Sequence, residues 1–341
     1  MRKDIHDYDL SRHNTFGIHA TCRRYIEFSD EADLIGILAS LTEADHPLFV
    51  VGGGSNILLT ADYPGTVLHS AIRGIEPMPY PTSADDILVR VGSGEVWDDF
   101  VATAVSHGWY GAENLSFIPG EIGASAVQNI GAYGVEAKDI IYKVEAVEIA
   151  TGSCITIPAA NIGYAYRYSR FKDEWRGRYV VTHVTYRLHR RFTPHTAYGN
   201  IAAELQRLGI ATPTAAQLRD VIISIRRDKL PDPDVEGNAG SFFMNPIISR
   251  AQYESLLATW PVMPHYDVDA DRVKIPAGWL IEQCGWKGKS LGKAGVHSRQ
   301  ALVLVNRGGA TGADIIHLSD TIRADVRTRF DIDIHPEVNI L

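Results

Sequence analysis

Three consecutive glycines at positions 52–54 lie between the apolar runs 50–51 and 57–58, and this feature most restricts the local fold. A glycine adopts backbone conformations that other residues avoid, and its bare amide can approach a phosphate without a Cβ in the way. The stretch lacks the GK[ST] ending of a P-loop, and it is not a GxGxxG that opens a helix. It therefore predicts a tight turn that can hold a phosphate outside the Rossmann and P-loop architectures.

The length and composition indicate a globular protein of more than one domain. The chain has 341 residues, of which 45% are apolar, and this exceeds what one core serves comfortably, so two or three domains are expected. Its net charge of −8 argues against a binder of nucleic acid or of anionic membranes, because such proteins must neutralise phosphates. An anionic ligand would need a local basic pocket.

Cysteine usage favours a reducing compartment. The cysteines lie far apart and show no CxxC spacing: Cys22, Cys154 and Cys284. Neither a disulfide framework nor a zinc site is supported, so a cytoplasmic location is expected. The first ten residues are charged from position 2 and have no apolar core, so no secretory signal is expected.

Neither a membrane span nor a bound metal is expected. No stretch approaches the roughly 20 apolar residues of a spanning helix. None of the 13 histidines falls in an HExxH arrangement. Three of them are interpreted as surface or structural residues: His183, His189 and His195.

Apolar periodicity predicts a fold in which helices and strands mix without strict βαβ alternation. The helix expected at 30–40 has apolar residues at helical spacing and Ser29 or Asp30 as its cap. Further helices are expected at 97–107, between 214 and 230, at 279–284 and around 315–326, and strands at 47–51, 87–92, 144–149, 179–188, 301–306 and 331–338. Thr-Pro pairs near 193 and 212 indicate a domain boundary around 190–213.

A second glycine-rich segment runs from 114 to 135 and is too ordered in composition to be a flexible linker. Its glycines, together with Ser125, Gln128 and Asn129, could wrap closely around a planar or phosphorylated ligand. The same composition is typical of tight turns that support a fold, because glycine-rich matches often arise by chance. The residues alone leave both interpretations open.

Seven motifs follow one another along the chain: GGGSN, IPGxxGxxxxQNIGAYG, GYxYRxSxFK, KLPDP, GNAGSFFxNP, AGWLIxxCGxKG and PEV. In this order they resemble the UDP-N-acetylenolpyruvoylglucosamine reductase family, also called UDP-N-acetylmuramate dehydrogenases, and the match covers nearly everything from Asn14 to Val338. The glycine turn also resembles FAD-binding domains of the vanillyl-alcohol-oxidase and para-cresol-methylhydroxylase (PCMH) type. The implied fold class is α+β: a PCMH-type FAD-binding domain at 1–190, made of two α+β subdomains that divide near 75, followed by a smaller α/β substrate-binding domain at 214–341. Residues 191–213 would connect the two domains and carry a mobile tyrosine loop.

The resemblance implies non-covalently bound FAD, held by the first two motifs. The residues that would contact it are Gly52, Gly53, Gly54, Ser55, Asn56, Ile118, Pro119, Gly120, Gly123, Ser125, Gln128, Asn129 and Ile130.

The resemblance assigns the chemistry to Arg167, Ser241 and Glu337. Reduction of an enol ether needs a hydride at one carbon and a proton at its neighbour, while negative charge develops on the attached carboxylate. Arg167 would bind that carboxylate, Ser241 would donate the proton, and Glu337 would polarise the substrate together with Arg167. Without these motifs, Arg167 could equally be a stacked or ion-paired surface arginine. Ser241 could end a turn, and Glu337 could be a solvated carboxylate on an edge strand.

Further residues are implied in substrate binding, and basic clusters near 226 and 287–293 would supply a local positive field. They are Tyr198, Arg226, Lys229, Asn245, Tyr266, Lys287 and Gln300. Asn245 is also a polar neighbour that could assist Ser241.

The chain departs from the family pattern at three places. His335 stands where an acidic residue is common, and the chain stops four residues after Glu337, so a frayed terminus that positions this carboxylate less firmly is expected. Asn200 and Ile201 differ from the commoner residues of the tyrosine loop of the family's first structural type, which puts loop closure in doubt.

The resemblance implies that NADPH reduces FAD, leaves, and is replaced by UDP-N-acetylglucosamine enolpyruvate, which becomes UDP-N-acetylmuramate in peptidoglycan precursor synthesis. A cytoplasmic monomer whose partners are small molecules is expected. Two alternatives stay open. One is an oxygen-using oxidase of an alcohol or sugar, since a fold alone does not fix the reaction. The other is a UDP-sugar-binding protein that has kept the pocket and lost the chemistry.

Overall fold

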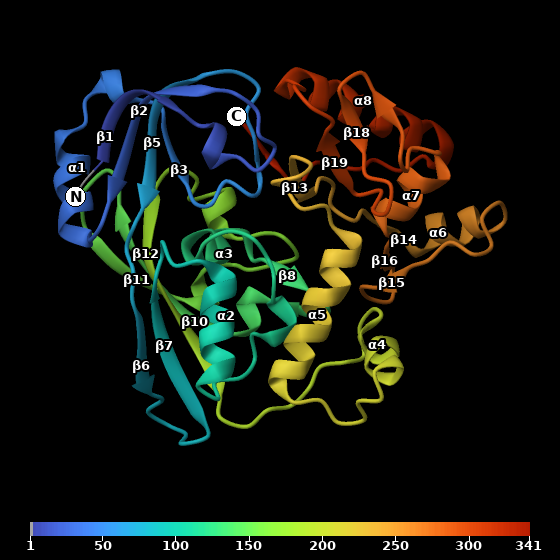
Figure 1. The fold of residues 1–341 in the computed structure, drawn as a ribbon, viewed down its shortest axis with the longest axis horizontal. Helices are drawn as coiled ribbons and strands as arrows, with labels where there is room; N and C mark the ends of the chain where they lie inside the picture. The colour runs from blue at the N-terminus through green and yellow to red at the C-terminus, as the bar shows by residue number, and fades with distance from the viewer. Residues whose placement is uncertain (1–2) are drawn as a thin grey trace. The chain divides into compact units, whose positions relative to one another are not determined.

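The structure is a computed structural model that describes residues 3–341. The chain divides into two compact units (Figure 1). The first contains the residues up to Tyr8, Thr21–Gly53 and Tyr63–Arg227, and the second contains Asp9–Ala20, Gly54–Asp62 and Asp228–Leu341. This division differs from the boundary expected around 190–213. The helix that follows that boundary packs its apolar side in a cluster with residues 201 and 205, which belong to the first unit.

Two sheets form the framework of the first unit. One has the strand order β1-β2-β5-β3, with β5 parallel to both β2 and β3, and the other is antiparallel in the order β11-β10-β12-β7-β6. The strands are β1 (Lys3–Asp9), β2 (Thr21–Phe28), β3 (Leu48–Val51), β5 (Tyr63–Ser70), β6 (Ile75–Pro79), β7 (Asp86–Gly92), β10 (Ile141–Glu148), β11 (Cys154–Pro158) and β12 (Tyr179–His189), with the short hairpin β8 (Gly131–Ala132) and β9 (Val135–Glu136). The first sheet ends before residue 75 and the second begins there.

Five α-helices are described in the first unit, and α1 begins at a side-chain cap. They are α1 (Glu31–Ser40), α2 (Trp97–Ser106), α3 (Ile122–Gln128), α4 (Ile201–Arg207) and α5 (Ala215–Lys229), whose last two residues pass into the second unit. Of the two predicted caps, Ser29 and Asp30, the cap observed for α1 is Asp30, because its side chain accepts a hydrogen bond from the Asp33 amide. Helix α3 was not predicted: its seven residues lie inside the glycine-rich segment that was expected to form turns or wrap around a ligand.

Aromatic side chains fill the core between the antiparallel sheet and helices α2 and α3. Trp97 and Phe100 of α2 are fully buried, and both rings contact the ring of Tyr186 on β12. Each such side chain contributes about 1.5–3 kcal/mol by leaving water. This core fixes α3, and with it the glycine-rich segment, against the sheet.

The second unit combines three small sheets with helices. The sheets are β13-β19-β18-β17, β14-β16-β15 and the parallel pair β20-β4. The strands are β4 (Ile57–Leu58), β13 (Asn238–Ser241), β14 (Ile247–Ser249), β15 (Tyr266–Asp267), β16 (Arg272–Lys274), β17 (Ser290–Leu291), β18 (Ala294–Val296), β19 (Val303–Asn306) and β20 (Asn339–Ile340), and the helices are α6 (Arg250–Leu257), α7 (Ala277–Gln283) and α8 (Gly312–Phe330). Phe242 and Phe243 are buried in its core with the apolar faces of α7 and α8.

The strand expected at 331–338 is not formed. Ile332, Ile334 and Val338 are buried while Asp333 and His335 are exposed, so the alternation read from the sequence is real. The backbone makes only an isolated bridge between Pro336 and Phe243 before β20 begins, so the described chain shows no ladder here. Alternation reports which face is buried and does not by itself supply a partner strand.

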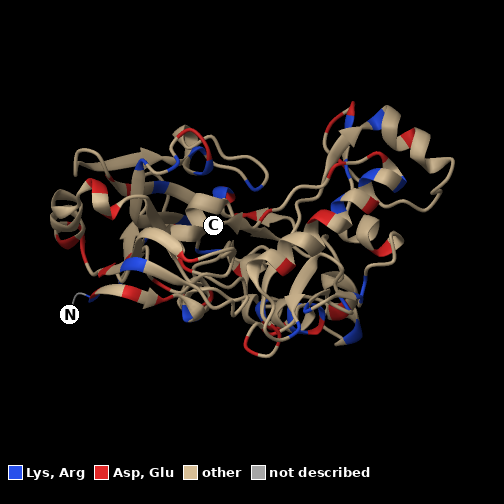
Figure 2. Ribbon diagram, turned by 90° about the horizontal axis from the view of Figure 1, so that it is seen from above, with Lys and Arg blue, Asp and Glu red and all other residues tan. Residues whose placement is uncertain are grey.

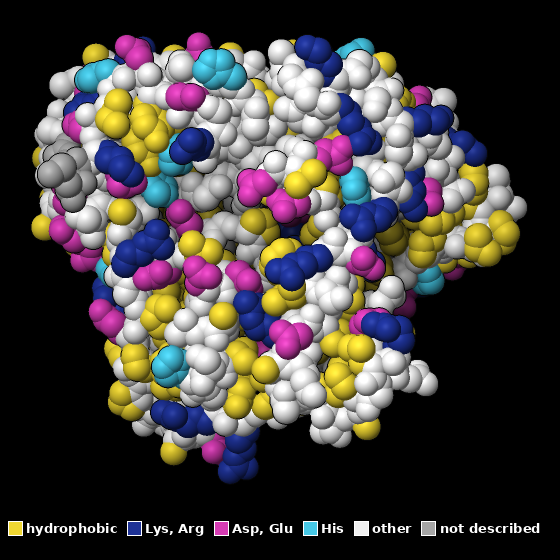
Figure 3. Space-filling model, in the orientation of Figure 1, with side chains coloured by type: hydrophobic (Ala, Val, Ile, Leu, Met, Phe, Trp, Pro, Cys, Tyr) yellow, Lys and Arg dark blue, Asp and Glu magenta, His cyan; other side chains and the backbone are white. Residues whose placement is uncertain are grey.

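Positions of positively and negatively charged residues lie interspersed along the ribbon (Figure 2). On the face drawn in Figure 3, hydrophobic side chains occur in small groups among polar and charged ones. Such a surface is ordinary for a globular protein, so the functional site has to be located from specific residues and their geometry. No helix within residues 3–341 combines the length and apolar character needed to cross a bilayer.

Candidate functional site

The two glycine-rich segments lie against each other in the first unit. A Cβ added at Gly53 would stand 3.2 Å from the Cα of Gly120, and one at Gly52 would stand 3.4 Å from the Cβ of Ala124. Side chains at these positions would fill the space between the turn after β3 and the start of α3. The bare backbone left there fits the approach of a diphosphate such as that of FAD, and the individual contacts stay predictions.

Gly54 belongs to the second unit and is required for a different contact. Its φ is +66°, and an added Cβ would stand 1.9 Å from the carbonyl oxygen of His13. The Thr15 amide donates to the Gly54 carbonyl at 3.1 Å. Position 54 therefore holds the turn against the residue 13–15 loop and accepts no other residue without backbone movement.

Helix α3 is held at its first turn and at its middle by groups of the first unit. The Gly123 amide donates to the Ser93 carbonyl at 2.9 Å, and a Cβ at Gly123 would come within 3.0 Å of the Ser93 Cβ. The Ser125 hydroxyl shares a buried hydrogen bond of 2.9 Å with the Tyr186 hydroxyl and donates to the Ile122 carbonyl at 2.7 Å. Ser125 thus fastens α3 to β12, and a direct FAD contact from its side chain stays a prediction.

Asn129 turns the chain at the end of α3. Its φ of +48° is left-handed, a conformation that asparagine tolerates better than most residues. The side chain donates to the Ala165 carbonyl at 2.8 Å and accepts from the Lys138 amide at 2.9 Å. Asn129 therefore joins three separate segments of the first unit. The sequence predicted Asn129 as an FAD contact and did not predict this structural role.

Arg167 lies on a tight turn that faces this corner. Ala165 and Tyr168 exchange two backbone hydrogen bonds, and Arg167 between them has a φ of +53°. Its guanidinium donates to the Gly131 carbonyl at 2.7 Å and more weakly to the Asn129 carbonyl at 3.5 Å. The arginine predicted to bind the substrate carboxylate is thus held on the β8–β9 hairpin by backbone acceptors.

Backbone strain is concentrated in these segments. Among residues 3–341, six residues other than glycine have positive φ, and four of them lie here: Phe117, Asn129, Tyr133 and Arg167. Left-handed conformations cost energy for such residues and persist only where the surroundings enforce them, which is typical of functional sites.

The strained Phe117 is held by charged groups that the sequence did not single out. Its amide donates to Asp98 Oδ1 at 2.5 Å, and Arg219 of α5 pairs with the same carboxylate at 2.6 Å. Arg226, also on α5, donates to the Phe117 carbonyl at 3.0 Å, and burial lowers the pKa of its guanidinium. Arg226 was predicted to bind substrate; the contact observed is with the loop that leads into Ile118 and Pro119.

Tyr198 lies in an exposed loop that contacts the β8–β9 hairpin. A Cβ at Gly134 would stand 3.4 Å from the Tyr198 Cβ. The Asn114 side chain donates to the carbonyls of Tyr133 and His195 at 3.0 and 2.9 Å, which ties the loop to the hairpin. The loop therefore lies against the same glycine-rich segment as Arg167, and its closure over substrate stays a prediction.

Ser241 and Glu337 come together in the second unit. Ser241 is exposed at the end of β13, opposite Val303 of β19. The Glu337 amide donates to the Phe242 carbonyl at 2.7 Å, one residue from Ser241. The predicted proton donor and the predicted catalytic carboxylate are thus carried on adjacent, hydrogen-bonded backbone segments.

The residues after Glu337 are held in place, which corrects the expected fraying. Strand β20 pairs with β4, and the Leu341 amide donates to the Leu58 carbonyl at 2.9 Å. The Asn339 amide and side chain both donate to the Asn56 carbonyl at 3.1 Å. Asn56, predicted as an FAD contact, therefore also anchors the segment that carries Glu337.

The remaining predicted substrate residues of the second unit have individual partners. Asn245 accepts from the Ala277 amide at 2.9 Å and so caps α7, and Lys287 pairs with Glu282 at 3.0 Å on the surface. Gln300 accepts from the Leu302 amide at 3.3 Å. Tyr266 is exposed, and Lys229 ends α5. Their substrate contacts stay predictions.

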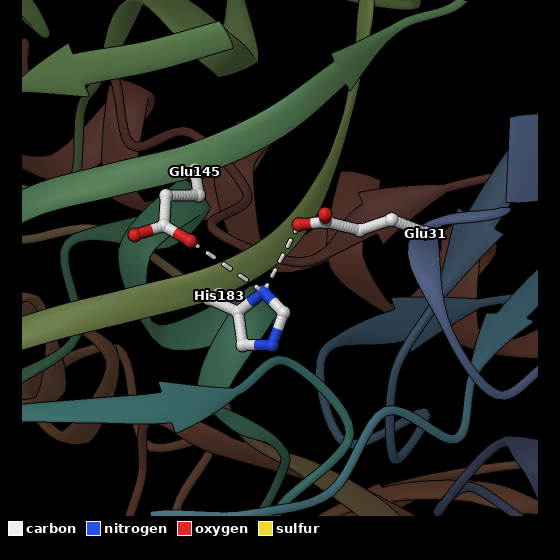
Figure 4. Close-up of side chains that lie close together, drawn as sticks. All are labelled: Glu31, Glu145 and His183. Atoms are coloured by element: carbon white, nitrogen blue, oxygen red, sulfur yellow. Dashed lines mark ion pairs between the residues drawn. The ribbon is translucent and has the colours of Figure 1, made fainter. Parts of the chain in front are cut away.

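Glu31, Glu145 and His183 form the one group within residues 3–341 whose donor atoms are close enough to hold a metal (Figure 4). His183 Nδ1 lies 3.3 Å from Glu31 and 3.8 Å from Glu145, and Arg90 contacts Glu145 at 2.7 Å. Burial lowers the pKa of His183. Lys143 also pairs with Glu145 at 2.9 Å, and Arg90 lies 4.0 Å from Glu31, so the group is an ion-pair cluster in the first unit.

Known protein families match both parts of the chain. The model of an FAD binding domain matches residues 22–158, and the model described as UDP-N-acetylenolpyruvoylglucosamine reductase, C-terminal domain, matches residues 232–341. With the glycine cradle and the two sheets of the first unit, these matches define a flavin-binding oxidoreductase.

The comparison with whole proteins is more specific. The chain is 55% identical over 335 residues to a UDP-N-acetylenolpyruvoylglucosamine reductase of Bacteroides fragilis, which covers 98% of this chain and 99% of that protein. It is 47% identical over 334 residues to the protein of the same name from Burkholderia ambifaria, covering 97% and 95% of the two chains. The chain belongs to the UDP-N-acetylenolpyruvoylglucosamine reductase family.

A solved structure has the same fold. The UDP-N-acetylenolpyruvylglucosamine reductase of Thermus caldophilus superposes with a TM-score of 0.66 at 21% identity, covering 100% of this chain and 98% of that one. The predicted family, the predicted α+β fold with its FAD-binding and C-terminal domains, and FAD as cofactor are confirmed.

Proposed function

We propose that this chain reduces UDP-N-acetylglucosamine enolpyruvate to UDP-N-acetylmuramate with NADPH, in the cytoplasmic synthesis of peptidoglycan precursors. Family membership supports the reductase activity. The observation that supports the residue assignment is the 2.7 Å hydrogen bond from the Glu337 amide to the Phe242 carbonyl, which joins the backbone at Glu337 to the residue after Ser241.

The reaction needs three contributions from the protein. When bound, FAD supplies the hydride chemistry between NADPH and the enolpyruvyl group. Gly52, Gly53 and Gly120 provide the bare backbone that would hold its diphosphate. The other two contributions, charge stabilisation and proton delivery, come from side chains.

Arg167 binds the carboxylate of the enolpyruvyl group and stabilises the negative charge that develops there. Its position supports this role, because two backbone carbonyls orient the guanidinium and the Lys172 ammonium fixes the Arg167 carbonyl at 3.0 Å. An arginine held in this way loses little further freedom when it binds an anion.

Ser241 donates the proton to the carbon next to the one that receives the hydride. A serine hydroxyl is a weak acid, so a nearby group has to assist it. The carboxylate of Glu337 polarises the substrate or relays a proton, and the hydrogen-bonded neighbourhood of the two backbone segments supports this role.

An anaerobic half-reaction tests the proposal. The FAD-loaded protein is reduced with one equivalent of NADPH, UDP-N-acetylglucosamine enolpyruvate is added, and the oxidised-flavin absorption band is followed. Return of the band without oxygen, with formation of UDP-N-acetylmuramate, is expected. If the band returns only when air is admitted, the oxidase alternative takes its place. If NADPH and the enolpyruvyl sugar bind without turnover, the chain is a binding protein.

A further inference from the structure

A buried histidine bridges two carboxylates in the first unit, close to the glycine turn. His69 lies on β5, and its Nε2 is 3.0 Å from Glu121 Oε1 while its Nδ1 is 3.3 Å from Glu27 Oε2. The three side chains are 11%, 12% and 17% exposed, so solvent screens these charges weakly. The predicted reaction does not use any of them.

Glu121 connects this cluster to the place where FAD is expected. It is the N-cap residue of α3 and follows Gly120 directly. Its other carboxylate oxygen, Oε2, lies 3.3 Å from the position that a Cβ would occupy on Gly52. A carboxylate therefore stands at the junction of the two glycine-rich segments, where a diphosphate would also bring negative charge.

Charges alternate along the cluster. Lys3 pairs with Glu27 at 2.9 Å, Glu27 contacts His69, and His69 contacts Glu121. Tyr25 of β2 stacks on the imidazole with a centroid distance of 6.1 Å, and Tyr8 of β1 stacks on Tyr25. These are the charged and titratable groups that face His69 from β1, β2 and the start of α3.

The imidazolium is favoured in this setting. Burial alone would lower the pKa of His69, but the contacts with Glu121 and Glu27 outweigh it and raise the pKa above the ordinary 6.5. When His69 loses its proton, Glu27 keeps Lys3 as a partner, whereas Glu121 loses the imidazolium beside the glycine turn.

We propose that His69 is a positioning residue for FAD: its imidazolium neutralises Glu121 and holds that carboxylate so that the turn at Gly52 and Gly53 accepts a diphosphate. An uncompensated carboxylate at this junction repels the two phosphates. FAD affinity is therefore linked to protonation of His69, and bound FAD in turn favours the protonated form. The inference rests on FAD binding at this turn.

The sign of the pH dependence follows from the raised pKa. Because the folded-state value lies above the ordinary one, the contribution of the imidazolium is fully present below about pH 6.5 and is lost as the pH rises through the folded-state pKa. FAD affinity is expected to fall over that window by about tenfold, a typical size for coupling between two sites.

The test is the Kd of FAD, measured between about pH 6 and pH 9 by diluting the holoenzyme and following flavin fluorescence. The wild-type Kd is expected to rise with pH. The His69→Gln variant is expected to bind FAD weakly at every pH. Glu121→Gln is expected to bind tightly at every pH, because it removes the carboxylate that His69 neutralises. The double variant is expected to recover the tight, pH-independent binding of Glu121→Gln.

His183→Gln is the matched control, because His183 also lies between two carboxylates of the first unit but belongs to the Arg90 cluster. It is expected to keep the wild-type pH profile. A flat wild-type profile, or a double variant as weak as His69→Gln, would overturn the proposal. If His69→Gln does not fold, the Kd of FAD for Glu121→Gln decides. A Kd that rises with pH as in the wild type would then overturn the proposal. NADPH and substrate are absent from the assay, so its outcome is independent of the proposed reduction.

Discussion

Replacing Gly131 by alanine tests whether the Arg167 guanidinium has to lie where the β8–β9 hairpin holds it. The added Cβ would stand 2.7 Å from Arg167 Nη1 and 3.0 Å from Glu136 Cγ and Val135 O. An unstrained contact is about 3.5 Å long, so the guanidinium has to move by roughly 0.8 Å. Because a misplacement of about 1 Å costs on the order of 10² in rate, we expect substrate reduction to slow by about 10- to 100-fold.

The fold should tolerate this change at a loss of about 1–3 kcal/mol in unfolding free energy, because the closest atom is the end of a side chain but the backbone oxygen of Val135 also has to shift. The rate of flavin reoxidation by the enolpyruvyl sugar is measured anaerobically by stopped flow, alongside thermal melting. Gly36→Ala is the control, since its Cβ meets no atom within 4 Å in α1. Gly36→Ala should keep the wild-type rate. A folded Gly131→Ala protein that reacts within about threefold of wild type would refute the reasoning.

Three further predictions concern the supports of the site. Ser125→Ala and Tyr186→Phe each remove the 2.9 Å hydrogen bond between two buried hydroxyls, so each should lower the free energy of unfolding in urea by about 1–2 kcal/mol. The double variant should lose less than the sum of the two single losses, and strictly additive losses would contradict this. Asn129→Ala keeps φ at +48° without the side-chain hydrogen bonds, so its free energy of unfolding should fall by about 2–3 kcal/mol. An unchanged urea midpoint would contradict this expectation. Deleting residues 339–341 removes β20 and should slow substrate reduction on the order of tenfold by loosening Glu337, whereas a full rate would show that β20 is dispensable.

Local signals were sufficient to predict much of the fold. The helix at 30–40 with its Asp30 cap, the helix that ends before Gly108, and strands β7 and β12 were expected within one or two residues of their observed bounds. Each has a clear apolar period and a terminating residue inside its own segment. Such features survive in any packing arrangement because they depend on neighbours in sequence.

Elements that depend on distant partners were missed. Helix α3 has only seven residues and contains glycine and serine, so its stability comes from contacts such as Gly123 on Ser93 and Ser125 on Tyr186. The strand expected at 331–338 had the right alternation and lacked a partner. Periodicity gives the buried face of a segment but not what covers it.

The candidate site shows the same difference between residues marked by local sequence signals and residues that act through distant contacts. Motif resemblance brought forward Arg167, Ser241 and Glu337, and the structure shows how each is carried. The supporting residues Asp98, Arg219 and His69 act through contacts that span roughly 20 to 120 positions of the chain, and no local pattern marks them. For Asp98, the sequence offered one signal: it is an acidic residue in the first turn of the predicted helix that became α2.

The proposed role of Ser241 is to deliver the proton in a flavin-dependent reduction. A single turnover of Ser241→Ala under anaerobic conditions tests this role, with NADPH added first and UDP-N-acetylglucosamine enolpyruvate second. The flavin band is expected to bleach at the wild-type rate and then fail to return. A return at the wild-type rate, with UDP-N-acetylmuramate formed, would contradict it.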